Sequence, residues 1–515
     1  MTEVRKSYDA VVIGAGVGGG AMANRLAEAG LRVLVVERGI RLPREADNWS
    51  VKAVFHDRKY STRETWRDRE GKEFRPSTYY YVGGNSKFFG TTTLRFRAED
   101  FEDLEHEGGG IAPAWPIRYA DLAPYYDVAE QLMGTHGTAG MDPCEPPRSG
   151  PMPYPAIGHE PEIEYFNTKL RTKGLKPFPL PVAVDLHPGG KCIRCATCDG
   201  FACKLGAKND AEVRLVDPAL ATGNVDLILE TQVKRLITDD TGRKVTGIEI
   251  EQKGQSTVIN GDLFVSSAGA INSAALLLRS ANAKHPKGLG NNSSDQLGRN
   301  YMAHNNTAMM AVNPLKKNHV VFQKSLCIND FYLKSDVKPY PLGNVQGLGK
   351  LQGGMLTANM KIVPEWLMSW FAERSVDWWI MSEDLPDPNN RVSVDSDGKI
   401  RVAYTPNNLK SHGELVKHWS KLVRSLGYPL IITQKMDITV AMHQCGTARF
   451  GTNPATSVLD PFCRVWDVDN LYVVDASFLP SSTAINPSLT IVAQAVRTAE
   501  HLLRDVFKVS TRKAA

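Results

Sequence analysis

Blocks of apolar and polar residues follow one another over the first forty residues in the order strand, turn, helix, strand. The apolar run Ala10 to Ile13 leads into a glycine-rich turn, apolar residues then recur at helical spacing, and a second apolar run covers Val33 to Val36. Short, continuous apolar runs are typical of buried strands. The pattern therefore predicts a strand–helix–strand unit over residues 8–38.

The turn in this unit has the spacing G-x-G-x-x-G, formed by Gly14, Gly16 and Gly19. Such glycines allow a tight turn, close approach of the backbone to a pyrophosphate, and close packing of helix on strand. The second strand ends at Glu37, whose carboxylate is placed to accept from a ribose hydroxyl. The combination predicts a dinucleotide-binding domain for NAD or FAD rather than NADP, and it does not separate those two.

Two later stretches repeat parts of this pattern. An apolar run near 263–266 leads through Ala268-Gly269 into a helix, and this second unit could extend the same parallel sheet. The run Leu471 to Val474 is predicted to be a buried strand that ends at Asp475, and a helix is predicted from Pro487 to Leu503.

The middle of the chain differs. Residues 143–190 are rich in proline and are predicted to form an extended connection with short elements. Residues 305–435 combine strand-like alternation with five large aromatic residues. These could line a substrate pocket or pack in a core, and the core is favoured for any single Trp; they are Trp366, Trp370, Phe371, Trp378 and Trp379.

Length and charge narrow the class of protein. The 515 residues suggest two or more domains, and a net charge of +5 is small for that length, so nucleic-acid binding is not predicted. The apolar runs are too short or too interrupted by glycine to cross a membrane, and the first strand begins by about residue 8, which leaves no room for a signal peptide. We expect a cytoplasmic protein.

Four of the eight cysteines form one cluster: Cys192, Cys195, Cys198 and Cys203. The spacing invites a metal or iron–sulfur interpretation, but Lys204 stands where the ferredoxin pattern has proline. Packing is favoured, a local disulfide stays open, and no metal is predicted.

Taken together, these stretches resemble the glucose–methanol–choline (GMC) family of flavin oxidoreductases. The resemblance also includes Gly298-Arg299-Asn300 with His304, and the segments 83–86, 115–126, 386–392 and 443–446. It implies FAD as cofactor and an α/β (overall α+β) fold, in which a sheet-containing substrate domain is inserted into a Rossmann-like FAD-binding domain. The implied division assigns 1–90, 200–304 and 436–515 to FAD binding, and 91–199 and 305–435 to the substrate domain and excursions.

The resemblance also implies roles for residues. His443 matches the histidine that accepts the hydroxyl proton, Asn486 matches the partner that holds the substrate oxygen, and hydride passes to flavin N5. The implied FAD contacts are Gly14, Gly16, Gly19, Glu37, Arg38, Gly84, Asn85, Ser86, Val233, Ala268, Gly269, Asp475, Ala476, Pro487 and Ser488.

Some relatives attach FAD covalently through a histidine in the loop that matches Gly84 to Phe88. This loop holds no histidine, so we expect dissociable FAD. Within the family, the chain looks most similar to bacterial pyranose oxidases and C-glycoside 3-oxidases, which implies oxidation of a sugar or glycoside at C3 or C2 and reoxidation by O2. The alternatives are a dehydrogenase with a quinone or protein acceptor, and a lyase that keeps FAD without redox chemistry; a pure binding protein is disfavoured. A homo-oligomer is possible.

Overall fold

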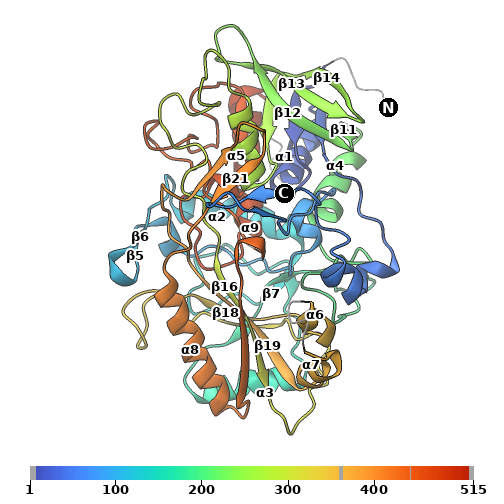
Figure 1. Cartoon of the computed structure of the whole chain (residues 1–515), viewed down its shortest axis with the longest axis vertical. Coiled ribbons are helices and arrows are strands. Elements are labelled where there is room, and N and C mark those ends of the chain that lie inside the picture. Colours follow the sequence, from blue (N-terminus) through green and yellow to red (C-terminus); the bar gives the residue numbers. More distant parts are fainter. Residues whose placement is uncertain (1–6, 359–362, 441, 510–515) are drawn as a thin grey trace.

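The computed structural model describes residues 7–358, 363–440 and 442–509. Its upper part in Figure 1 is built on a five-stranded sheet of order β11-β2-β1-β15-β23, in which every pairing is parallel. The predicted strands β1 (Ala10–Ile13) and β2 (Val33–Val36) are confirmed, and β15 (Leu263–Ser266) extends the same sheet as expected. The outer strands are β11 (Val225–Ile228) and β23 (Leu471–Val473).

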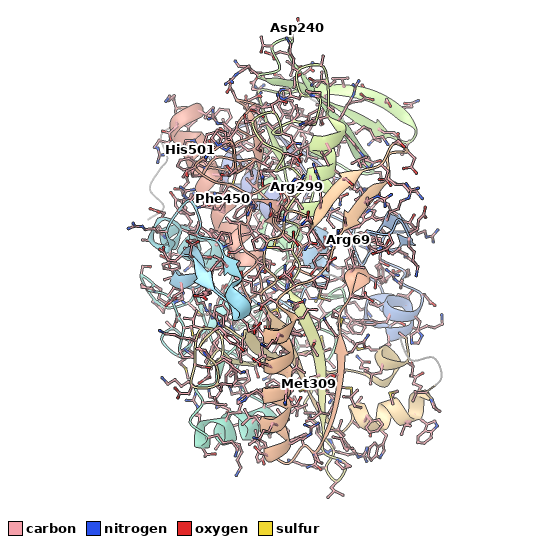
Figure 2. All side chains as sticks on the ribbon, turned by 60° about the vertical axis from the view of Figure 1, so that its left-hand side comes forward. Arg69, Asp240, Arg299, Met309, Phe450 and His501 are labelled. Atoms are coloured by element: carbon pink, nitrogen blue, oxygen red, sulfur yellow. The ribbon has the colours of Figure 1, made fainter. Side chains whose placement is uncertain are left out.

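Helices cover this sheet because its central strands are apolar on both faces. The helix α1 (Val17–Glu28) follows the glycine-rich turn and packs against α9 (Ser488–His501), which also contacts α2 (Tyr119–Met133). Further helices are α4 (Asp217–Ala221) and α5 (Ala270–Arg279). A second sheet, β12 (Thr231–Thr238), β13 (Val245–Gln252) and β14 (Gln255–Asn260), lies at the top, and Asp240 marks its first turn in Figure 2.

The lower part is built on an antiparallel six-stranded sheet of order β22-β16-β19-β18-β17-β9. Its strands are β22 (Leu430–Lys435), β16 (Asn305–Val312), β19 (Ser375–Ser382), β18 (Asn344–Gly347), β17 (Leu326–Ile328) and β9 (Phe178–Pro179). One face forms an apolar core with α3 (Pro161–Thr172) and α8 (Leu409–Ser425). The short helices α6 (Gly353–Thr357) and α7 (Glu365–Ala372) flank the sheet (Figure 1).

A four-stranded sheet joins distant segments, because β20 (Arg391–Val394) and β21 (Ile400–Ala403) pair with β3 (Trp66–Arg67) and β4 (Glu73–Phe74). The strand β20 also contacts α5. The remaining short strands are β5 (Leu104–Glu105), β6 (Ile111–Ala112), β7 (Thr135–Gly137), β8 (Tyr154–Pro155) and β10 (Val182–Ala183).

One expectation from the proline-rich stretch is wrong. Residues 161–172 form the regular helix α3. Pro161 occupies its first turn, where proline is tolerated because the missing N–H would have no partner, and Ile163, Phe166 and Leu170 are buried at helical spacing. Among the described residues, no helix is both long enough and apolar enough to cross a membrane.

Candidate functional site

The glycine-rich turn has the shape of a phosphate cradle. Gly14 has φ +100°, and a Cβ added there would lie 2.4 Å from the carbonyl oxygen of Ser267; a Cβ on Gly19 would lie 2.0 Å from the carbonyl oxygen of Gly14. A Cβ on Gly16, in contrast, would meet nothing within 4 Å. Gly14 and Gly19 therefore serve the local packing, while the backbone at Gly16 stays open to a ligand at the start of α1.

Glu37 lies at the end of β2 beside this turn. Its carboxylate accepts from the N–H of Ala15 at 3.0 Å and of Gly39 at 2.9 Å, and burial raises its pKa. The next residue, Arg38, lies 3.7 Å from the ring centroid of Tyr80. The N–H of Thr231 donates to the Glu37 carbonyl at 3.1 Å, so Val233 lies two residues further along β12, close to this end of β2.

The loop at residues 83–87 lies directly on the glycine-rich turn. The N–H of Gly83 donates to the carbonyl of Ala15 at 2.9 Å, and a Cβ on Gly84 would lie 3.4 Å from the Cα of Gly16. The Asn85 Oδ1 accepts from the N–H of Tyr79 at 3.0 Å. Ser86 fixes the loop from inside, since its hydroxyl donates to the Gly83 carbonyl at 2.5 Å and accepts from the N–H of Ala211 at 3.0 Å.

Asp475, just after β23, is bonded to a second predicted contact, Gly269. Its carboxylate accepts from the N–H of Gly269 at 3.0 Å and of Ser477 at 2.9 Å, and burial raises its pKa. The carbonyl of Ala476 accepts from the N–H of Gly446 at 3.2 Å. The other predicted contacts lie beside the starts of helices: Ala268 before α5, and Pro487 and Ser488 at the start of α9.

These residues fit a dinucleotide cofactor. They combine an open glycine backbone, two helix N-termini and a buried carboxylate near the predicted ribose position. When bound, the pyrophosphate would be held by the turn at Gly14, Gly16 and Gly19, and the ribose by Glu37.

His443 and Asn486, far apart in sequence, lie next to each other. The Nε2 of His443 is 3.3 Å from the Asn486 Nδ2, and its Nδ1 is 2.9 Å from the Nδ1 of His304. The His304 Nε2 is 2.8 Å from the carbonyl oxygen of Ser482. His443 has φ +61°, a left-handed backbone conformation that is uncommon for residues other than glycine and is often found at functional sites.

The contacts determine which nitrogen carries each proton when both rings are neutral. A carbonyl oxygen only accepts, so the His304 Nε2 carries the hydrogen and its Nδ1 is an acceptor. The His443 Nδ1 must then donate to His304. This leaves the Nε2 of His443 unprotonated, accepting from the Asn486 amide. The pair therefore presents a basic nitrogen beside an amide donor, an arrangement that suits removal of a proton from a hydroxyl group.

Both rings are held in the neutral state. Loss of water around the imidazole lowers the pKa of His443 well below its ordinary value, and the neighbouring His304 and Lys324 lower it further. Burial also lowers the pKa of His304. A neutral His443 can accept a proton at physiological pH.

Gln346 extends the network and had no signal in the sequence. Its Nε2 donates to the Asn486 Oδ1 at 3.2 Å, and its Oε1 accepts from the hydroxyl of Thr92 at 3.1 Å. All contacts from Thr92 through Gln346, Asn486 and His443 have a consistent donor and acceptor assignment. Sequence reasoning gave no role to Gln346 or Ser482, and it included His304 only as part of a family-like block.

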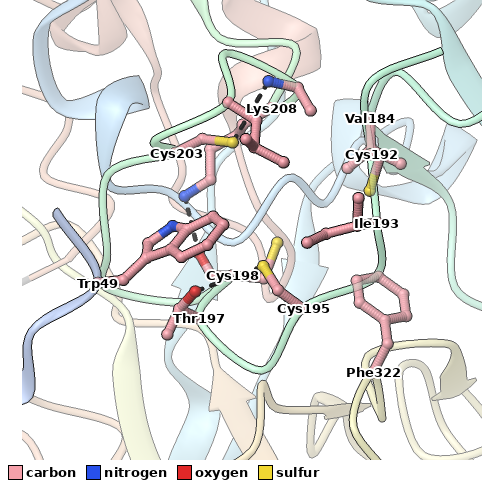
Figure 3. A pocket seen from close by; sticks show the side chains of 12 residues that line it. Trp49, Val184, Cys192, Ile193, Cys195, Thr197, Cys198, Cys203, Lys208 and Phe322 are labelled. Atoms are coloured by element: carbon pink, nitrogen blue, oxygen red, sulfur yellow. Dashed lines mark hydrogen bonds between the residues drawn. The ribbon is translucent and has the colours of Figure 1, made fainter. Parts of the chain in front are cut away.

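The cysteine cluster lies next to the residues that follow the loop at 83–87, since the N–H of Gly200 donates to the carbonyl of Phe88 at 3.2 Å. Its four thiols line one cavity with Trp49, Ile193 and Phe322 (Figure 3). All four are free, and burial raises the pKa of the Cys198 thiol to about 12. No group of three or more His, Cys, Asp or Glu side chains is arranged to hold a metal ion in the described part of the chain.

The chain is similar to known proteins over most of its length. The family model described as GMC oxidoreductase matches residues 78–305 with its N-terminal part and 389–495 with its C-terminal part, and an NAD(P)-binding Rossmann-like domain matches residues 12–67. Paromamine 6′-oxidase of Streptomyces fradiae is 31% identical over 98% of this chain and 93% of its own length. The fructose dehydrogenase large subunit of Gluconobacter japonicus is 25% identical over 98% of this chain and 99% of its own.

Solved structures share the fold. Pyridoxine 4-oxidase from Mesorbium loti superposes with a TM-score of 0.66 at 19% identity, covering 96% of this chain and 99% of its own. A formate oxidase variant from Aspergillus oryzae gives 0.69 at 17% identity, covering 98% and 99%.

Proposed function

Because the chain belongs to the GMC oxidoreductases, flavin enzymes that act on CH–OH groups, we propose that it oxidises a secondary hydroxyl of a pyranose sugar or glycoside to a keto sugar, with FAD as cofactor. The observation that carries the proposal is the place of the His443 ring, whose Nε2 lies 3.3 Å from the Asn486 Nδ2 and whose Nδ1 contacts His304.

In the proposed reaction, His443 accepts the hydroxyl proton at Nε2 and Asn486 holds the substrate oxygen with its amide. A positioned base of this kind contributes roughly 10²–10⁴ in rate. Bound FAD would supply the chemistry that takes up a hydride from the carbon that carries this hydroxyl group. His304 shares the Nδ1 proton of His443, so the imidazole keeps its orientation when its other nitrogen becomes protonated.

We assign the reaction to C3, or C2, of a glucosyl unit, with O2 as the acceptor and FAD bound without a covalent link. The support is the resemblance of the loop at 83–90 and of the cysteine cluster to bacterial pyranose and C-glycoside oxidases. A second candidate is oxidation at the 6′ position of a sugar, which the 31% identity to paromamine 6′-oxidase favours. The likeness to a fructose dehydrogenase favours a non-oxygen acceptor as the alternative for reoxidation.

The test is anaerobic mixing of the yellow holoenzyme with glucose, xylose, paromamine, and aryl C- and O-glucosides, followed through the visible flavin absorbance. We expect bleaching by glucose or a glucoside, return of colour on admission of air, and a C3 carbonyl in the product by NMR. A carbonyl at C6 would select the second candidate. If the colour returns only with a quinone, the quinone replaces O2 as the proposed electron acceptor. If no alcohol bleaches the flavin, the lyase alternative is favoured.

A further inference from the structure

Lys324 is a buried lysine that the proposed reaction does not use. Its side chain is 4% exposed, and its Nζ lies 2.7 Å from the Asp199 Oδ1. A lysine is rarely buried unless its charge is paired. The ammonium group has three hydrogen-bond donors, and among the described residues Asp199 is its one hydrogen-bond partner. The pairing with Asp199 explains why the charge can be buried, but it leaves open what the ammonium group does there.

The ammonium group lies against the end of the loop at 83–90, whose earlier residues include the predicted FAD contacts Asn85 and Ser86. A Cβ added to Gly90 would lie only 2.3 Å from the Lys324 Nζ, so a side chain at position 90 would displace the ammonium group. The positive charge is therefore held directly beside the loop that is predicted to contact the cofactor.

Two further observations place Lys324 close to the His443–Asn486 pair. Gly347 follows Gln346 in β18, and a Cβ added to Gly347 would lie 3.6 Å from the Cα of Lys324. Gln346 in turn donates to the Asn486 Oδ1 at 3.2 Å. The charge of Lys324 also lowers the pKa of His443, an effect that weakens with distance. The ammonium group thus lies near both the predicted cofactor loop and the proton acceptor.

The segment that carries the cysteine cluster holds Asp199 in place. The Nζ of Lys208 donates to the carbonyl of Cys198 at 2.7 Å and to that of Phe89 at 2.9 Å, which joins this segment to the cofactor loop. The second carboxylate oxygen of Asp199 accepts from the N–H of Gly349 at 2.5 Å. The cysteine segment therefore fixes a carboxylate, and this carboxylate fixes the ammonium group of the lysine.

We propose that Lys324 supplies a fixed positive charge that stabilises the reduced state of bound FAD, and that Asp199 positions this charge. In the proposed reaction the C–H and O–H bonds of the alcohol break and a carbonyl forms. The hydroxyl proton goes to His443, and the hydride carries two electrons and one proton to the cofactor, which gains one negative charge. At an effective dielectric constant of about 20, a unit charge within about 10 Å changes such an equilibrium roughly tenfold or more. The inference rests on the proposed function for its cofactor and reaction, and not on a particular sugar.

The experiment measures the two-electron midpoint potential of the FAD-loaded protein by anaerobic titration against a reference dye, without any sugar. Lys324→Gln keeps a donor for Asp199 but loses the charge. It should weaken the reduced state relative to the oxidised state about tenfold, which lowers the potential by about 30 mV. Lys324→Arg keeps the charge and should stay within about twofold of wild type, or about 10 mV. Asp199→Asn removes the counter-charge and should raise the potential.

Lys350→Gln is the matched control, because this lysine is also largely buried beside an aspartate, with its Nζ 3.6 Å from the Asp377 Oδ2. It should have the wild-type potential. If Lys324→Gln holds FAD poorly, its combination with Asp199→Asn leaves no unpaired carboxylate, and this double variant should lie about 30 mV below Asp199→Asn alone.

A wild-type potential in Lys324→Gln, an equal lowering in Lys324→Arg, or a lowered potential in Asp199→Asn would overturn the role of Lys324. Failure of every sugar to reduce the wild-type flavin, in a protein that shows the expected shifts in potential, would instead overturn the proposed function and leave this inference standing.

Discussion

The contact between His304 and His443 leads to a prediction about two variants of similar size. His304→Asn can place an amide oxygen near the present Nδ1, and this oxygen still accepts from His443. His304→Gln places its amide near the present Nε2, where it contacts the Ser482 carbonyl but no longer accepts from His443. Because only the acceptor at Nδ1 fixes the tautomer of His443, the asparagine variant should retain activity and the glutamine variant should lose it.

The size of the expected loss in rate for His304→Gln follows from the geometry. The contact is 2.9 Å long and His304 is buried, so the His443 Nδ1–H would lose its partner without gaining water. An unsatisfied buried donor costs about 1–3 kcal/mol, and the ring can avoid this cost by moving the proton to Nε2, where it no longer acts as a base. The fraction of the active tautomer, and with it the rate of flavin reduction, should fall roughly ten- to hundredfold in the glutamine variant.

The assay is single-turnover anaerobic reduction followed by stopped flow, as a function of pH, with FAD content and melting temperature as controls for folding. In wild type and His304→Asn, the reduction rate should show no fall as the pH is lowered through 6.5, because the pKa of His443 lies well below this ordinary value and the base stays unprotonated there. If both variants reduce at equal rates with the same pH profile, the assignment of the Nε2 lone pair to the catalytic base is refuted.

Three further predictions concern the cofactor and stability. The Gly16→Ala apoprotein should melt at the same temperature as wild type but bind FAD at least about tenfold more weakly, because a Cβ there meets no protein atom and only blocks a ligand. Gly158→Ala, where a Cβ also meets no atom, is the control, and a Gly16→Ala variant that binds FAD as tightly as wild type would contradict the cradle. His412 is buried and its pKa is lowered to about 4, so acidification from pH 6.5 to 4 should lower the free energy of unfolding by about 3 kcal/mol, because the unfolded chain takes up the proton first. The pKa values of Asp100 and Asp384, raised to about 7, act in the opposite direction, so the measurement is the difference in urea unfolding between wild type and His412→Asn at each pH. A difference that does not change with pH would contradict the lowered pKa of His412. Acid precipitation should release the yellow colour into the supernatant, and colour that stays in the pellet would show a covalent link.

Strands and helices whose residue pattern lies within one short segment could be predicted from the sequence. The strands β1 and β2 agree with their apolar runs to the residue, because a buried parallel strand needs no partner to be visible as a pattern. The helix α3 was hidden by the prolines around it, although Ile163, Phe166 and Leu170 have helical spacing.

The site itself depends on contacts between distant segments. The assignment of His443 and Asn486 came from the family resemblance, and the structure brings them to 3.3 Å. Gln346 lies in a strand of only four residues, and its side chain contacts Asn486, which is 140 positions further along the chain. No local pattern contains that contact. For the same reason the sequence could not separate Trp378, which packs against Trp419 and Phe166, from Trp379, which belongs to another apolar cluster.

The strand order of the nucleotide-binding sheet has a consequence for biosynthesis. The first strand made, β1, lies at the centre between β2 and β15; β15 comes from near residue 265, and the outer strand β23, which pairs with β15, from near residue 472. At about 5–20 residues per second, a ribosome needs roughly half a minute to two minutes for the 515 residues. During about the first half of this time the nascent chain exposes the edge of β1 that β15 later covers, and β15 then lacks its own neighbour β23 until most of the chain has been made. We therefore expect the N-terminal half to depend on chaperones until β23 and α9 have been made, and nonsense mutations that remove β23 or α9 to yield aggregated protein rather than a partly active enzyme.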